Sequence, residues 1–131
     1  MKISMEDILL ITALENISKV NVKDCIARGD VITYLVRGQE VGRAIGKKAI
    51  NVKTLESKLK KKIEIVGFYK EPADVLIKTF DIKIEEKQIK NKKLIIKLDA
   101  LNKKKVFSKL SRFKRVKELI KRNYDLEMIL N

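Results

Sequence analysis

An internal repeat restricts the fold of this chain more than any other feature of its sequence. A shift of 61 residues aligns five pairs of apolar positions: Leu35 with Ile96, Ile45 with Val106, Val52 with Phe113, Leu55 with Val116 and Leu59 with Ile120. Around these pairs, six expected elements recur in the order helix, strand, strand, helix, helix, strand. This order predicts an α+β fold rather than a doubly wound parallel sheet. Chance alignment of a Lys- and Ile-rich sequence is the alternative.

The hydrophobic periodicity and the turn residues give the expected positions of the elements. In the first half we expect a helix at 4–18 with Ser4 as its N-cap, strands at 20–28 and 30–37, helices at 40–45 and 50–60, and a strand at 63–69. After Pro72 we expect a helix at 73–80, strands at 81–89 and 92–99, helices at 102–107 and 111–123, and a strand at 126–130. The first helix is apolar around most of its circumference, so we expect it to be buried against a sheet.

The charge of the chain indicates an anionic partner. Lys and Arg number 31 against 17 Asp and Glu, giving a formal net charge of +14. Residues 87–122 alone hold 15 Lys or Arg against Asp99 and Glu118. Such an excess favours binding to nucleic acid or to an acidic membrane surface, and a solvated lysine-rich face without a ligand is the alternative. The membrane is disfavoured because the apolar positions of helix 111–123 align with core positions of the first copy.

Several classes of site are excluded by composition. The chain has no His, and Cys25 is its only Cys, so zinc fingers and His-based nucleophilic sites lack their ligands and bases. Cys25 lies in an apolar-alternating stretch, where we expect it to be buried in a strand. We find no paired-acid motif or nucleophile signature, and therefore expect no enzyme, no metal, no cofactor and no small-molecule substrate. No apolar run approaches the roughly 18 residues of a membrane span, so we expect a soluble, cytoplasmic protein.

The segment VGRAIGKKAINVKTLESKLKKKIEIV, residues 41–66, carries the most chemical information. A short helix is expected to end at Ile45, and Gly46-Lys47-Lys48-Ala49 then leads into the next helix. The start of a helix offers unpaired backbone N–H groups and a positive dipole end, which bind phosphate. Gly46 has no Cβ to keep a sugar-phosphate chain away, and the lysines add charge. The spacing fits neither a P-loop, which needs four residues between its glycines, nor a Gly-x-Gly-x-x-Gly dinucleotide site.

This segment resembles the core of KH domains, whose signature is close to Ile-Gly-x-x-Gly-x-x-Ile. The resemblance implies a binding site for single-stranded RNA. Its candidate residues are Arg43, Ile45, Gly46, Lys47, Lys48, Ala49, Asn51 and Lys53, with Lys109 and Arg112 in the second copy.

Two departures from the KH signature matter. Ala49 replaces the second glycine, which is tolerable if the local conformation is helical and unfavourable if it requires positive φ. The second copy has Phe107-Ser108-Lys109-Leu110 in place of the loop and has lost both glycines. We therefore expect a basic surface there that is indifferent to sequence, with Phe107 serving packing.

A broader resemblance covers essentially the whole chain. The N-terminal helix, Asp24-Cys25-Ile26, GQEVGRAIGKKAINVKTLESKL and a second copy ending near ELIKRNY resemble archaeal NusA-like transcription termination/antitermination factors. In that family both domains are type II KH folds, which here implies two tandem KH domains, 1–70 and 71–131, each a three-stranded sheet covered by helices. It also implies RNA binding in transcription elongation and termination, with RNA polymerase as a partner. A KH protein of ribosome assembly or RNA processing is the alternative.

Overall fold

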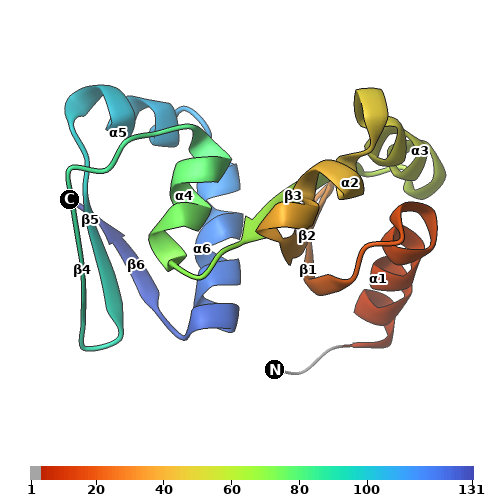
Figure 1. Ribbon diagram of the computed structural model, residues 1–131, viewed down its shortest axis with the longest axis horizontal. Coiled ribbons are helices and arrows are strands. Elements are labelled where there is room, and N and C mark those ends of the chain that lie inside the picture. The colour runs from red at the N-terminus through yellow and green to blue at the C-terminus, as the bar shows by residue number, and fades with distance from the viewer. Residues whose placement is uncertain (1–3) are drawn as a thin grey trace. The chain divides into compact units, whose positions relative to one another are not determined.

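The computed structural model describes residues 4–131, which form two compact units, one ending at Phe68 and the other comprising Tyr69–Asn131 (Figure 1). The α-helices and β-strands of both units follow the same order of helix, strand, strand, helix, helix, strand, and the first unit adds two 3-10 turns, so the predicted repeat is confirmed. Each unit combines helices with one three-stranded sheet. The predicted α+β class is therefore confirmed.

The first unit contains a mixed sheet. Its elements are α1 (Met5–Ser18), β1 (Val22–Arg28), β2 (Val31–Arg37), η1 (Gly38–Glu40), α2 (Val41–Ile45), η2 (Lys47–Ala49), α3 (Ile50–Leu59) and β3 (Lys62–Phe68). The strand order is β1-β2-β3, with β1 antiparallel and β3 parallel to β2. A parallel pair needs a crossover connection, and α2 and α3 provide it. The loop between these two helices is thus an obligatory part of the connection from β2 to β3.

The second unit repeats this topology. Its elements are α4 (Pro72–Phe80), β4 (Glu86–Lys90), β5 (Lys93–Lys97), α5 (Ala100–Phe107), α6 (Leu110–Tyr124) and β6 (Glu127–Leu130). Strand β5 pairs antiparallel with β4 and parallel with β6. Pro72 occupies the first turn of α4, as predicted, where its missing N–H is not needed. Helices α4 and α6 lie side by side, and the Phe80 and Phe113 ring centroids are 6.4 Å apart.

The core of the first unit joins the sheet to α1 and α3. Tyr34 in β2 is fully buried, and its hydroxyl donates a hydrogen bond of 2.7 Å to the carbonyl oxygen of Leu10 in α1. Burial raises the pKa of the Tyr34 hydroxyl, which stays protonated and keeps donating. Cys25 in β1 is buried in the same hydrophobic core as Tyr34, as predicted. Helix α1 is therefore anchored to the sheet by a hydrogen bond as well as by apolar packing.

The expected burial of α1 is only partly realised. Ser4 caps the helix as predicted, because its Oγ accepts the N–H of Asp7 at 3.1 Å. Leu14 is fully buried, but Ile8 and Leu9 are 46% and 65% exposed. The prediction of burial around most of the circumference is therefore wrong for Ile8 and Leu9. Leu10 and Ile11 are half-buried against the core and Leu14 follows them, so the contact of α1 with the sheet begins at Leu10.

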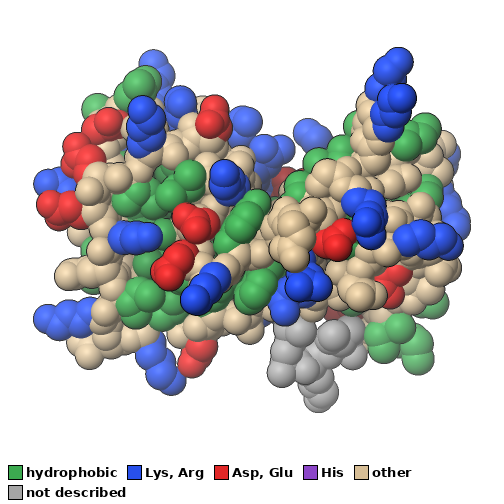
Figure 2. All heavy atoms as spheres, in the orientation of Figure 1, with side chains coloured by type: hydrophobic (Ala, Val, Ile, Leu, Met, Phe, Trp, Pro, Cys, Tyr) green, Lys and Arg blue, Asp and Glu red, His purple; other side chains and the backbone are tan. Residues whose placement is uncertain are grey.

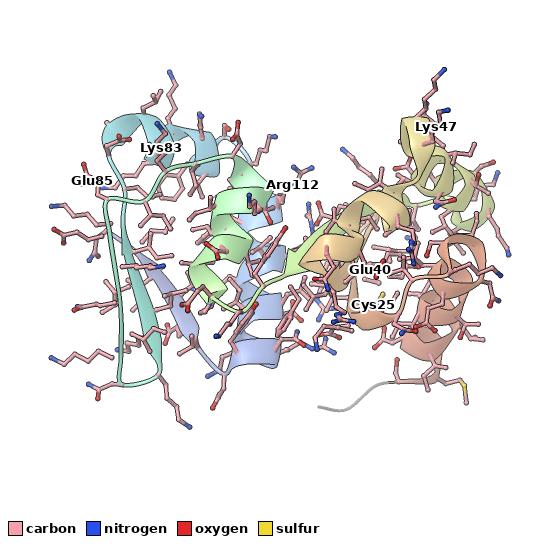
Figure 3. The ribbon with its side chains drawn as sticks, in the orientation of Figure 1. Cys25, Glu40, Lys47, Lys83, Glu85 and Arg112 are labelled. Carbon is pink, nitrogen blue, oxygen red and sulfur yellow. The ribbon has the colours of Figure 1, made fainter. Side chains whose placement is uncertain are left out.

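Strand β4 begins at Glu86 and not at 81 as predicted. Asp81 has a left-handed backbone (φ 54°) that ends α4, and Ile82 then turns into the core with 4% exposure. The N–H of Lys83 donates to Oδ1 of Asn102 at 3.1 Å, a partner in α5 rather than in the sheet. Lys83 and Glu85 mark this segment in Figure 3. Lys83 is therefore bonded to α5 before the chain pairs with β5 as strand β4.

No helix among residues 4–131 combines the length and apolar character that crossing a lipid bilayer requires.

Candidate nucleic-acid interface

The loop between α2 and α3 has an unusual backbone. Gly46 ends α2 with φ 82° and ψ 164°, and η2 follows as a single tight turn. Within that turn Lys48 has φ 54° and ψ 31°, and Ala49 has φ 60° and ψ 29°. Two consecutive non-glycine residues therefore adopt left-handed conformations immediately before α3 begins.

Gly46 is required by the geometry of this loop. A Cβ added there would lie 2.8 Å from Nδ2 of Asn51 and 3.0 Å from Cγ2 of Ile50. The Nδ2 atom of Asn51 donates a hydrogen bond of 3.1 Å to the carbonyl oxygen of Arg43. Asn51 thereby ties the first turn of α3 to α2 across the loop. Its predicted contact with RNA remains a prediction, but its amide already has a partner within the protein.

Ala49 occupies the less favourable of the two conformations considered for it. Its φ of 60° is left-handed, where a Cβ costs about 1–2 kcal/mol relative to the right-handed region. Ala49 is also the N-cap of α3, and no side chain caps this end of the helix. The N–H of Ile50 donates to the carbonyl oxygen of Lys47, so the amide groups left for an anion at the start of α3 are those that follow Ile50, and one methyl group lies beside them.

The loop is positively charged and accessible. Lys47, Lys48 and Lys53 are exposed, and Figure 3 shows Lys47 extending outward from the turn. Arg43 is 63% exposed and forms an i,i+3 ion pair of 3.5 Å with Glu40. The first turn of α3 contains no acidic residue. Because a helix N-terminus is itself electropositive, these side chains and the helix dipole act in the same direction on an anion.

The apolar candidates flank this basic loop. Ile45 ends α2 and is half-buried. Ile50, which we did not include among the candidates, begins α3 with 56% of its side chain exposed. An exposed apolar side chain beside a cationic loop is available for contact with a base. Its exposure depends on how α3 packs and could not be read from the sequence.

The corresponding connection in the second unit is built differently. Helix α5 runs to Phe107, Ser108 keeps helical angles (φ −67°, ψ −15°), and Lys109 (φ −128°, ψ 53°) leads into α6 at Leu110. No left-handed residue occurs at 107–110 within the described chain. Lys109 is exposed, and Arg112 lies half-buried in the first turn of α6 (Figure 3). This connection therefore lacks the conformation that brings the backbone of the first loop to its surface.

Phe107 does not serve packing as predicted. Its side chain is 52% exposed, and Leu110 is 45% exposed. The inner face of α5 is formed by Val106 and Asn102, one turn apart, which leaves Phe107 on the side away from the core. Lys and Arg side chains project outward over α5 and over the α2–α3 loop in Figure 2.

Comparison with known proteins identifies the relatives of this chain. No family model matches it. Over 67 residues it is 36% identical to a probable transcription termination protein NusA of Methanocaldococcus jannaschii, covering 51% of this chain and 37% of the relative. Over 92 residues it is 34% identical to the protein of the same name in Methanococcus vannielii, covering 70% of this chain and 53% of the relative.

A solved structure extends the similarity to almost the entire chain. The crystal structure of APE1850 superposes with a TM-score of 0.83 and 25% identity, covering 98% of this chain and 100% of that one. The matches to the two NusA relatives span about half of their length or less. The resemblance predicted from the sequence is nevertheless confirmed: this chain is similar to archaeal NusA proteins.

Proposed function

We propose that this protein binds single-stranded RNA through the α2–α3 loop and acts in transcription elongation and termination, each of its two units being a type II KH domain. The element order, with a helix pair crossing between two parallel strands, supports the assignment of the units. The name of the relatives, probable transcription termination protein NusA, supports the process.

One observation carries the proposal. The α2–α3 loop joins a glycine that the fold requires, two exposed lysines and the uncapped N-terminus of a ten-residue helix. Phosphate groups would lie against the start of α3, where backbone amides and the helix dipole favour negative charge. Lys47 and Lys48 would neutralise them, and exposed Ile50 would contact a neighbouring base. Contacts to the phosphates from a loop, combined with contacts to an unpaired base, are how single-stranded RNA-binding modules recognise RNA.

The proposal includes no catalytic step, no cofactor and no small-molecule substrate. We propose that the protein acts by binding alone. Its proposed protein partner is RNA polymerase. A KH protein of ribosome assembly would have the same fold, so the partner distinguishes the two. Co-purification of the tagged protein with RNA polymerase supports the proposal, whereas co-purification with ribosomal subunits alone contradicts the transcription role.

Charge reversal in the loop tests the RNA site. The variant carries Lys47→Asp and Lys48→Asp, and its control carries Lys58→Asp and Lys60→Asp, an equal change of charge at the other end of α3. We expect the loop variant to lose roughly 2 kcal/mol of binding, more than about tenfold in affinity, and the control to lose clearly less. The control should melt at a somewhat lower temperature, because negative charge at the C-terminus of α3 opposes the helix dipole by about 0.3–1 kcal/mol per charge, whereas the loop variant should melt no lower than the wild type. Both affinities are therefore measured well below the melting temperatures.

The salt dependence gives a second measure. If about four phosphates are neutralised, the log–log slope of affinity against salt should be near −3, from about −0.7 per phosphate. Equal losses in the two variants, or binding that does not depend on salt, would place the RNA elsewhere.

A further inference from the structure

Phe107 is the exposed aromatic residue of this chain. The four Phe and three Tyr all lie within the described residues 4–131, and of these Phe107 alone is exposed, with 52% of its side chain accessible. Fully burying a phenylalanine stabilises a fold by about 1.5–3 kcal/mol, and about half of that contribution is forgone here. The ring also stands where the repeat places Gly46 in the first unit, at the end of the shorter helix of the pair.

The surroundings of Phe107 are strongly basic. Residues 100–114 contain no Asp or Glu, and their six basic residues are Lys103, Lys104, Lys105, Lys109, Arg112 and Lys114. Lys103 and Lys104 precede Phe107 by four and three positions and so share its face of α5. Lys105 is directed elsewhere, because its Nζ donates to the carbonyl oxygen of Asp81 at 3.0 Å. An aromatic ring flanked by lysines is the combination with which proteins bind single-stranded nucleic acid.

The backbone of this connection cannot act as the first loop does. Positions 107–110 have side chains throughout and no left-handed residue, so a Cβ stands at every position facing solvent. Recognition at this end of the second unit must therefore come from side chains. A ring offers its π-face to a base, and the lysines offer charge to the adjoining phosphates.

We propose that Phe107 is a stacking site for one unpaired RNA base, with Lys103, Lys104 and Lys109 contacting the phosphates on either side. This rests on the proposed RNA binding and adds a second contact of different chemistry. The first unit binds the backbone of the RNA through its loop, and the second binds the face of a base. Stacking tolerates any base, so this contact adds affinity with little sequence preference.

Three variants test the proposed stacking contact. The affinity of each is measured for a short, unstructured single-stranded RNA of mixed A and U. Phe107→Ala removes the ring, Phe107→Tyr keeps it, and Leu101→Ala removes a 65% exposed apolar side chain elsewhere on the same helix. We expect Phe107→Ala to weaken binding about fivefold or more, the lower end of what one base–aromatic stack contributes, and the other two to bind like the wild type. The salt slope should stay unchanged in Phe107→Ala, because no charge is removed.

Photo-crosslinking of the wild type gives an independent measurement. The same RNA carrying 5-iodouridine should crosslink to Phe107, mapped by mass spectrometry, without any variant having to fold. Wild-type affinity in Phe107→Ala with no crosslink at Phe107 overturns the stack and leaves the proposed function standing. Equal losses in Phe107→Ala and Leu101→Ala, or an altered salt slope, also overturn it.

Two further outcomes separate the remaining explanations. If the wild type binds no single-stranded RNA, the proposed function and the stack both fail. If Phe107→Ala binds RNA normally but no longer co-purifies with RNA polymerase, the ring belongs to a protein contact and the stacking site is refuted.

Discussion

Two glycines four residues apart should respond to alanine in opposite ways. At Gly46 the backbone (φ 82°, ψ 164°) lies in a region essentially reserved for glycine, and a Cβ would come within 2.8 Å of the Asn51 amide. At Gly42, inside α2, a Cβ would meet nothing within 4 Å. The same substitution therefore introduces a collision at one site and improves helix propensity at the other.

The magnitudes follow from these geometries. Forcing alanine into the Gly46 conformation costs roughly 1–3 kcal/mol. Displacing Asn51 also breaks its 3.1 Å hydrogen bond to the carbonyl oxygen of Arg43, worth roughly 0.5–1.5 kcal/mol. Gly46→Ala should thus destabilise the first unit by about 2–4 kcal/mol, while Gly42→Ala should stabilise it by roughly 0.5–1 kcal/mol.

Urea denaturation followed by circular dichroism measures both effects, and RNA affinity is measured on the folded proteins. Gly46→Ala should also weaken RNA binding, because it displaces the turn that leads into α3. A Gly46→Ala protein as stable as the wild type, or a Gly42→Ala protein equally destabilised, would refute the loop geometry described above.

Three smaller predictions concern single contacts. Ala49→Gly removes a Cβ from a left-handed residue and should stabilise the first unit by roughly 0.5–1 kcal/mol; a lower urea midpoint would contradict this. Tyr34→Phe removes the side-chain donor to the Leu10 carbonyl oxygen, which keeps only its helical partner, and should cost about 1 kcal/mol in thermal or urea unfolding, so unchanged stability would argue against that anchor. Asp99 caps α5, and the backbone N–H of Asn102 lowers its pKa, so this stabilisation is present above the unfolded pKa and lost as pH falls through the folded one. Asp99→Asn keeps the cap and should reduce the acid sensitivity of the melting temperature, and identical pH profiles of the two proteins would disprove this role.

The sequence predicted the architecture because the repeat and the apolar periodicity depend on local order. Pro72 and Ser4 are local signals too, and both occupy the helix-start positions expected of them. The start of β4 was missed because the alternation around Ile82 is typical of a strand, while the hydrogen bond to Asn102 comes from another helix. Local patterns carry no information on such a partner.

The candidate site was predictable in its position but not in its conformation. The spacing of Gly46 and the lysines located the loop, whereas the left-handed backbone of Ala49 is imposed by how α2 and α3 meet. The exposure of Phe107 was missed for a similar reason. An aromatic residue at a helix end is usually buried, and only the packing of Val106 shows that the ring faces outward.

Among residues 4–131, four helices end in a left-handed residue that is not glycine. Lys19, Lys60, Asp81 and Asp125 have φ between 54° and 61° at the C-caps of α1, α3, α4 and α6. Glycine would adopt this conformation without strain, but it would also leave the denatured chain with more backbone freedom. With 5 glycines in 131 residues, the disordered ensemble of this protein is comparatively stiff, which limits the entropy gained on unfolding. The choice of cap residue therefore affects the free energy of unfolding through both states. Glycine at these four caps would relieve the backbone strain of the native state, but it would also raise the conformational entropy of the unfolded state.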